Sequence, residues 1–436
     1  MTSPREFRPS LPSPPPAFVL KYYLYRATAA VGFTTPIWYL YLEATTGSYA
    51  LAAAANAVWW TCLILFEVPT GYVGDRIGRR RALLAGTALT ACTTAAMAFV
   101  DSFAEVALVF VLWAVGSTFR SGTTDAWLYE LLGRRDDDGD GDVERSADRP
   151  DERLDETQFA RVRGRGGTVA AVTSGATALA GGYLARGSMA DAYLASAVVV
   201  ALGLPVLWSL PAAPPREDEF TVLDALPVLR EQFGRPPLRS FVLLMALYSG
   251  VHWGVNFFVQ PVGVDLGLSR AHLGWMFAGF TALTGGVSYL SGTIEEHVGV
   301  RTWFRTVPVG LAIAFLAVAA VPWLAVPVFF LMRGLRGAAM PLANQFLNDH
   351  AEDVGRATLL SAAGMVYNLV TVPFELSAGA LADVLGPVPT IGLFGAALLV
   401  GSVALLVAGS PFRAPPGGSG DRPSADAQKN VSLSRR

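Results

Sequence analysis

Several charged side chains occur inside long apolar segments, where a helix crossing a bilayer would hold them away from bulk water. Arg120, Arg333 and Arg336 each interrupt such a segment. A guanidinium at the middle of a bilayer costs from about 2.5 to more than 10 kcal/mol unless it meets water or an anion. These arginines could therefore bind a negatively charged solute or tune the ionisation of a nearby acid. This is the chemistry of solute binding and ion coupling.

One apolar segment carries polar side chains along a single helical face. They recur at offsets of 3, 7 and 11 residues, which stacks them above one another on a helix. We interpret them as the wall of a water-filled cavity, with hydrogen bonding between helices as the alternative. Arg336 and Asn344, eight residues apart, likewise share a face of a later segment. The polar stripe consists of Ser249, His252, Asn256 and Gln260.

Titratable side chains in these segments could couple solute movement to protons. His252 belongs to the residue type that titrates near neutral pH, and Asp125 and Glu67 are the acidic candidates. Arg120 would tune their protonation. Glu375 is the remaining acid within an apolar segment, and we interpret it as structural.

The segments that position these side chains are long enough to cross a bilayer. The chain has 436 residues, of which 52% are hydrophobic and 16% charged, whereas a soluble domain carries about 25% charged residues. A helix needs about 20 apolar residues to cross roughly 30 Å of hydrocarbon. We predict an all-α integral membrane protein with twelve transmembrane helices in two pseudo-symmetric six-helix bundles. The spans are expected at about 18–43, 48–70, 82–101, 104–131, 166–186, 190–210, 239–262, 270–293, 302–321, 324–347, 357–381 and 387–409.

The remaining segments divide the chain around these bundles. Nearly all Lys and Arg residues fall on the side of the two termini, and the positive-inside rule makes that side the cytoplasm. We therefore expect a multi-pass plasma-membrane protein with both termini cytoplasmic. The predicted parts are a disordered tail at 1–17, a bundle at 18–210 with an acidic insert at 133–158, a linker with an amphipathic helix at 211–238, a bundle at 239–410 and a disordered tail at 411–436.

Metal and nucleotide sites are not expected. Asp136, Asp138 and Asp140 resemble the start of a calcium loop, but the twelfth position, which needs an acid, holds Ala147. The histidines lack metal-ligand spacing, and no lysine lies in a phosphate-binding loop. These absences argue against an enzyme, a cofactor, an ATP-driven pump and a nucleic-acid partner.

The densest charge in the chain lies between the second and third predicted spans, in GYVGDRIGRRRAL (71–83). Its glycines at 71, 74 and 78 would let another backbone approach closely. Asp75 could accept hydrogen bonds from the N-terminus of a neighbouring helix. The stretch therefore indicates a site of contact between helices, in addition to a positively charged turn.

Together with the preceding FEVPTG (66–71), this stretch resembles the signature loop of the major facilitator superfamily, in its drug-exporter-like members. The resemblance implies two bundles that rock about a cavity lined by the first, fourth, seventh and tenth spans. It also implies a cytoplasmic gate, in which Asp75 meets the helix beginning near residue 356 and Arg79 pairs with Asp125 or Glu130. The residues of this gating motif are Gly71, Gly74, Asp75, Arg76, Gly78, Arg79 and Arg80.

The second half of the chain carries a degraded copy of the motif, as two parallel halves would require. SGTIEEHVGVRTWF (291–304) aligns with TGYVGDRIGRRRAL (70–83) at a constant offset of 221. The matching pairs are Gly292 with Gly71, Glu296 with Asp75, Gly299 with Gly78, and Arg301 with Arg80.

We therefore expect a monomeric secondary transporter that moves a small organic solute by alternating access. Proton-coupled efflux of amphipathic compounds is the favoured interpretation. The alternatives are an importer or uniporter of a polar or anionic metabolite, and a membrane sensor that transports nothing. The expected partners are a small-molecule substrate, the lipid bilayer and protons.

Overall fold

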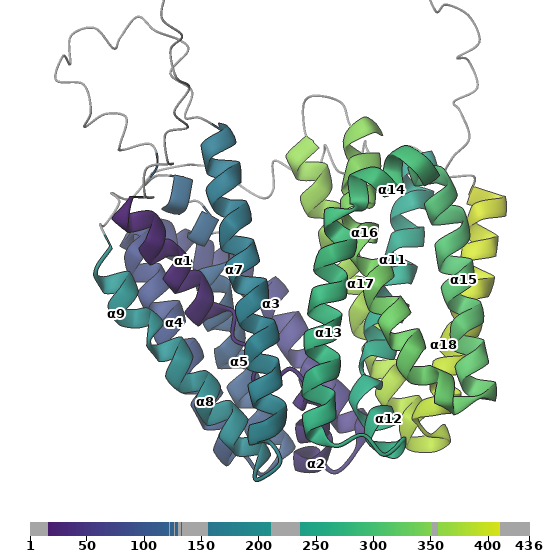
Figure 1. The fold of residues 1–436 in the computed structure, drawn as a ribbon, viewed down its shortest axis with the longest axis horizontal. Coiled ribbons are helices and arrows are strands. Elements are labelled where there is room, and N and C mark those ends of the chain that lie inside the picture. Colours follow the sequence, from purple (N-terminus) through teal and green to yellow (C-terminus); the bar gives the residue numbers. More distant parts are fainter. Residues whose placement is uncertain are drawn as a thin grey trace, which may run out of the picture.

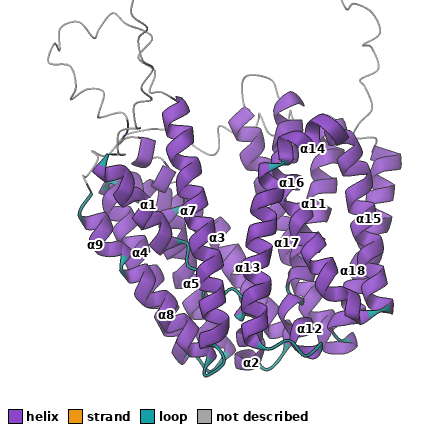
Figure 2. Cartoon of the chain, viewed as in Figure 1, coloured by secondary structure: helices purple, strands orange, loops and turns teal. Residues whose placement is uncertain are grey.

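The computed structural model describes residues 16–121, 123–125, 127–129, 132, 156–210, 236–350 and 356–409. All regular secondary structure in these ranges is helical (Figure 2). Glu130, nearly all of the acidic insert, the predicted linker helix and almost all of both predicted tails lie outside the described residues.

The first half of the chain contributes a run of helices that corresponds to the first six predicted spans. The helices are α1 (Ala17–Ala29), α2 (Trp38–Thr46), α3 (Tyr49–Ile77), α4 (Arg79–Ala96) with a 3-10 turn at Met97–Phe99, α5 (Phe103–Arg120), α7 (Glu156–Leu184), α8 (Met189–Ala201) and α9 (Gly203–Trp208).

The second half repeats this organisation. Its helices are α11 (Pro236–Asn256), α12 (Val259–Asp265), α13 (Arg270–Tyr289), α14 (Ser291–Val298), α15 (Val300–Ala320), a 3-10 turn at Pro322–Leu324, α16 (Ala325–His350), α17 (Arg356–Leu385) and α18 (Pro387–Ala404), which ends in a π turn at Leu405–Gly409.

Each predicted span coincides with one helix or with two consecutive helices. In the described part of the chain, nine helices, some counted together with a short neighbour, are long and apolar enough to cross a membrane. The other three predicted spans correspond to α1 with α2, to α7, and to α13 with α14. The prediction of one continuous span at 18–43 was wrong, because α1 ends at Ala29 and α2 begins only at Trp38.

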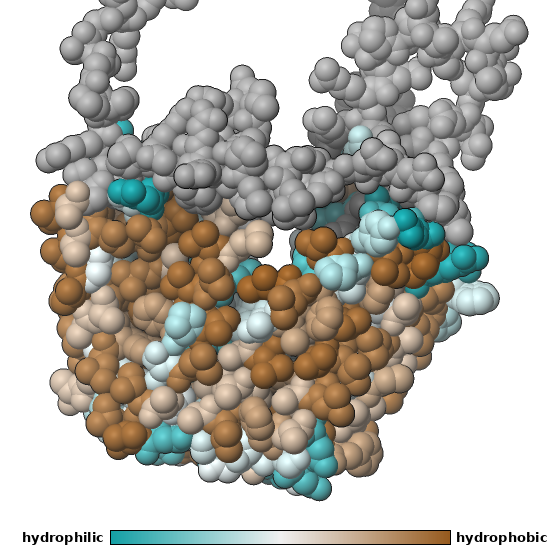
Figure 3. Space-filling model, turned by 180° about the vertical axis from the view of Figure 1, so that it is seen from behind, coloured by the Kyte–Doolittle hydropathy of each residue, from teal (hydrophilic) through white to brown (hydrophobic). Residues whose placement is uncertain are grey.

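The two halves lie side by side (Figure 1), and two long pairs of helices join them, together with a shorter contact between α2 and α12. α7 packs against α13, and α3 packs against α17. We call the end of the bundle where α3 ends and α17 begins the tail side, and the opposite end the far side. Apolar side chains cover most of the visible outer surface, as a protein surrounded by lipid requires (Figure 3).

The turn after α3 and the turn after α14 share an unusual backbone conformation. Gly78 has φ 88° and ψ 142°, and Gly299, 221 residues later, has φ 75° and ψ 146°. The amide of Gly78 donates to Gly74 O at 3.0 Å, and that of Gly299 donates to Glu295 O at 2.9 Å. Only glycine adopts such a conformation readily. The internal repeat seen in the sequence is therefore present in the backbone.

The gating motif itself is mostly helical. α3 continues to Ile77 and α4 starts at Arg79, so Gly78 alone separates the two helices. The motif places its acid and first arginines on the last turn of α3 and the first turn of α4.

Candidate functional site

Gln260 holds the broken first span in place. Its Oε1 accepts hydrogen bonds from the backbone N–H groups of Tyr39 (2.8 Å) and Leu40 (3.3 Å), and its Nε2 donates to Thr35 O at 2.8 Å. These backbone groups lie at the start of α2 and in the break, where no helical partner exists. Gln260 is only 2% exposed. It therefore joins the two halves at the far side and does not present its amide to open space.

Arg120 binds the chain at the other end of the same break, where α1 ends. Its Nη2 donates to Ala29 O at 3.0 Å, at the C-terminal end of α1, where a positive charge is favourable. The next residue, Ser121, donates from Oγ to Glu67 Oε1 at 2.8 Å. Arg120 thus binds a backbone carbonyl of α1, and Glu67 of α3 binds the residue that follows α5.

Arg333 lies near the middle of α16, among aromatic rings of the second half. Its Nη2 donates to Asn256 Oδ1 in α11. Its Cζ lies 5.4 Å from the ring centroid of Phe280 and 5.7 Å from that of Phe277, both in α13. Cation–π contacts of this kind stabilise a guanidinium without neutralising it.

Arg336 lies three residues further along α16 and contacts Trp253, with Cζ 5.1 Å from the ring centroid. Trp253 in turn lies 6.0 Å from Trp60 of α3, so a ring from the first half reaches this cluster. Both arginines are half-buried. Within the described ranges, neither forms an ion pair with a carboxylate.

The rest of the polar stripe is buried in the second half. His252 is 0% exposed, and neither of its ring nitrogens has a hydrogen-bond partner. Tyr248 and Trp253 flank its ring, with centroids at 6.4 and 5.7 Å. Asn344 lies apart from this group on the exposed surface of α16.

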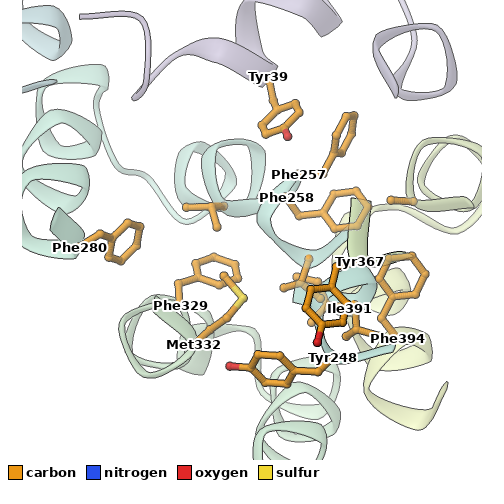
Figure 4. Close-up of a cluster of buried hydrophobic side chains, with 14 of the residues drawn as sticks. Tyr39, Tyr248, Phe257, Phe258, Phe280, Phe329, Met332, Tyr367, Ile391 and Phe394 are labelled. Atoms are coloured by element: carbon orange, nitrogen blue, oxygen red, sulfur yellow. The ribbon is translucent and has the colours of Figure 1, made fainter. Parts of the chain in front are cut away.

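Figure 4 shows a cluster of packed aromatic and aliphatic side chains, and it includes Tyr248, Phe257 and Phe258, which are neighbours of the stripe residues in the chain. Tyr39 reaches this cluster from the first half, and its ring centroid lies 4.5 Å from that of Phe257. All four stripe residues are buried in this conformation, and Asn256 and Gln260 hydrogen-bond to other segments, as in the alternative interpretation of the stripe. Arg333, Arg336 and Trp253 thus lie beside a packed apolar cluster to which both halves contribute.

At the tail side, the gating motif makes contacts within its own half. Asp75 pairs with Arg79 at 3.6 Å, one helical turn away. Asp125 instead accepts from Arg163 Nε of α7 at 2.8 Å. Arg79 was predicted to pair with Asp125, but in this conformation the partner of Asp125 is Arg163. Glu130, the other predicted partner, lies outside the described residues.

The two other motif arginines lie over aromatic rings. Arg76 Cζ is 4.3 Å from the ring centroid of Tyr72, and Arg80 Cζ is 5.3 Å from that of Trp208. Gly71 has open space where a side chain would project, within the part of the chain that the structure describes. Gly74 faces Ala82 of α4.

The contact between α7 and α13 widens from the far side to the tail side. A Cβ at Gly182 would lie 2.6 Å from Arg270 O, and one at Gly175 would lie 3.8 Å from Thr281. At Gly167, a further two turns toward the tail side, nothing in the described ranges would lie within 4 Å. The two helices therefore diverge along their length.

The contact between α3 and α17 changes in the same direction. At the far side, Asp383 accepts hydrogen bonds from Ser48 Oγ (2.9 Å) and from the amides of Tyr49 (2.9 Å) and Ala50 (3.1 Å). A Cβ at Gly379, one turn inward, would collide with Tyr49 O. At Gly364, near the tail side, the described residues leave open space. Figure 3 shows a recess between the two halves at the tail side.

Asp383, Arg163 and Trp253 were missed by sequence reasoning. Asp383 had a usable signal, since Glu375, Gly379 and Asp383 recur at intervals of four residues on one helical face. Arg163 lies in a basic, glycine-rich stretch with nothing to distinguish it from its neighbours. Trp253 could not be separated from ordinary apolar packing residues.

Comparison with known proteins agrees with this architecture. A family model described as Major Facilitator Superfamily matches residues 26–372, and again residues 241–433. A curated relative from Bacillus subtilis (strain 168), "Uncharacterized MFS-type transporter YxaM", is 23% identical over 383 residues, which cover 80% of this chain and 88% of the relative.

Solved structures of low sequence identity share the fold. The nucleoside transporter NupG superimposes with a TM-score of 0.70 at 13% identity, over 89% of this chain and 97% of that one. A bacterial homologue of the human lysosomal transporter Spinster, in an inward-facing and occupied conformation, gives 0.65 at 16% identity, over 91% and 94% of the two chains. A D-xylose–proton symporter gives 0.63 at 14% identity, over 89% and 95%. With the family model covering most of its length, the chain belongs to the major facilitator superfamily, whose members are membrane transporters.

Proposed function

We propose that this protein is a secondary active transporter that binds a small amphipathic organic anion between its two halves and moves it by alternating access. The observation that carries the proposal is the pair Arg333 and Arg336. Both are half-buried near the middle of a spanning helix, and in the described ranges neither is paired with a carboxylate.

The chemistry around the pair favours an anion with an apolar body. Two cations three residues apart repel each other and are costly in a membrane, so a bound carboxylate or similar group would offset both penalties. The rings of Trp253, Phe277 and Phe280 would bury an aromatic or aliphatic portion of the same molecule. Asn256 already orients Arg333 by hydrogen bonding.

The packing of the interface supports alternating access. We propose that the tail side is cytoplasmic, because the Lys and Arg residues of the sequence favour that orientation. The conformation is then closed outside and open inside. Transport would require the far-side contacts of Asp383 and Gly182 to separate while Asp75 closes on the start of α17.

We further propose coupling to protons and outward movement, in a monomer of the plasma membrane. The FEVPTG stretch (66–71) and the gating motif resemble those of drug exporters, and this resemblance supports the outward direction. One protein of similar fold is, by its name, a proton symporter, which supports proton coupling in this fold but not the direction.

Proteoliposomes test the proposal. Salicylate, its neutral counterpart salicylamide and an aromatic amine would be offered with and without a pH gradient. Salicylate flux should exceed the other two and should depend on the gradient. Arg333→Gln and Arg336→Gln should each weaken apparent affinity about tenfold to a hundredfold, because a charge-assisted hydrogen bond contributes about 1.5–3 kcal/mol.

Arg186→Gln is the matched control, since Arg186 is exposed in the loop after α7. It should transport like the unaltered protein. Equal transport of the anion and the neutral compound, unaffected by both substitutions in α16, would overturn the assignment of the site.

A further inference from the structure

Glu375 is a fully buried acid at the contact between the two halves. It lies in α17, is 0% exposed, and accepts a hydrogen bond from Asn56 Nδ2 of α3 through one carboxyl oxygen. Its other oxygen, Oε1, has no hydrogen-bond partner. The indole of Trp60 lies beside the carboxyl group, but its Nε1–H is also unpartnered.

No cation neutralises this acid in the described part of the chain. The ion pairs there, Asp75 with Arg79 and Asp125 with Arg163, do not include it. The titratable groups that neighbouring helices bring to this region are Tyr39 of α2, Tyr49 of α3, Tyr248 and His252 of α11, and Arg333 and Arg336 of α16. The sequence of α18 contains no titratable residue.

Burial without a counter-charge favours the neutral form of the carboxyl group. An ionised carboxylate removed from water costs several kcal/mol even after the protein relaxes around it. A neutral acid fits the geometry, because one oxygen accepts from Asn56 and the other can carry the proton. We therefore expect the carboxyl group of Glu375 to be protonated while the far side is closed.

The position of Glu375 links its protonation to the far-side contact. Glu375, Gly379 and Asp383 lie at successive intervals of four residues, on the face of α17 that packs against the start of α3. Gly379 touches Tyr49 and Asp383 caps α3. When these contacts separate, the carboxyl group of Glu375 meets water from the far side and can ionise.

We propose that Glu375 makes the far-side gate pH-sensitive: its carboxylate takes up one proton from far-side water as the gate closes, and the acid returns that proton to the same water when the gate opens. The proton forms an O–H bond with one carboxyl oxygen, and no other bond is made or broken. This inference rests on the alternating access of the proposed function. It does not depend on which solute is carried.

A distance measurement without substrate tests the inference. Cys62 and Cys92 would be replaced by serine, and spin labels placed at Asp101→Cys and Trp323→Cys, two exposed far-side positions in different halves. In lipid nanodiscs, the fraction of molecules with an open far side should rise with pH. A gate that releases one proton on opening shifts its equilibrium up to tenfold per pH unit.

Two neutral substitutions should abolish this pH dependence. Glu375→Gln keeps a group that accepts from Asn56, and Glu375→Met is a second neutral replacement of similar size. Both should keep the far side closed from pH 5 to pH 9. Asp383→Asn is the matched control: it should open the far side at every pH while the slope with pH persists.

A full pH slope in either Glu375 variant would overturn the inference, as would an unaltered protein whose far side does not respond to pH. Arg336→Gln separates this test from that of the proposed function. It should bind the solute about tenfold to a hundredfold more weakly yet retain the pH slope. Each proposal is therefore tested by its own measurement.

Discussion

The pairs α3–α17 and α7–α13 run through both ends of the interface between the halves, but the two ends are packed differently. At the far side, Gly182 and Gly379 bring backbones together and Asp383 caps α3. At the tail side, Gly167 and Gly364 face open space among the described residues. Small residues and a single helix cap make a contact that can form and separate at modest cost. A few close approaches of backbone therefore distinguish the two ends, in addition to the aromatic contacts between the halves at the far side.

The largest expected effect comes from filling one of those close approaches. Gly182→Val would drive a side chain into Arg270 O and the backbone of Gly274. Overpacking of this kind costs about 1–3 kcal/mol or more, so the equilibrium should shift away from the closed far side by about fivefold to more than a hundredfold. Distances between far-side spin labels would measure the shift.

Gly167→Val is the matched substitution at the other end of α7. It has open space in the present conformation and should not disturb it. It should instead hinder closure of the tail side, so that the protein stays in the conformation described here. If the two variants shift the distances in the same direction, the two ends do not work as alternating gates.

A smaller effect is expected from the acids that face helix N-termini. Asp383→Asn keeps the shape of the side chain but removes the charge that three donors of α3 share. A helix cap contributes about 0.5–2 kcal/mol, so the far side should open about twofold to thirtyfold more often. Crosslinking between cysteines placed across the far side would report it.

Asp75→Asn applies the same kind of change at the tail side. Its pairing with Arg79 lies within one half, so the variant should fold normally and keep its far-side distances. Transport should fall sharply, because the tail-side gate would close less well. Unchanged flux in this variant would remove the gating role from the motif.

The smallest effect should come from the two repeated turns. Gly78→Ala and Gly299→Ala each force a Cβ into a positive-φ conformation, at a cost of about 1–2 kcal/mol. The two variants should lower the thermal unfolding temperature in detergent by similar amounts. Gly364→Ala, in open space within a helix, should not lower it.

The number of helices, the two halves and the repeated motif could be predicted because hydropathy and glycine spacing act locally. The break in the first span could not be located from composition, since residues 30–37 are mostly apolar or small and only Gly32 and Pro36 hint at it. Gln260 shows a second limit. A polar stripe on a helix looks the same whether it faces a cavity or another helix, and only the fold brings its amide to Tyr39.

The gate contacts show a third limit. Arg79 and Arg163 are both candidate partners of Asp125 by charge, and the choice depends on which conformation the halves adopt. One sequence must be compatible with every conformation that a transporter adopts, so charge alone does not show which pair forms in a given conformation. The gating role of these residues therefore stays a prediction, and the pairing that Asp125 makes in this conformation could not be predicted from charge alone.

The matching glycine turns at 78 and 299 point to descent from a single ancestral gene that was duplicated and fused. An ancestral six-helix protein of this kind would have had to associate with a second copy of itself to enclose a pathway. The present halves have since diverged, for the first copy keeps Arg79, Arg80 and Arg81 where the second has Val300, Arg301 and Thr302. Fused halves, unlike identical partners, can change independently of each other.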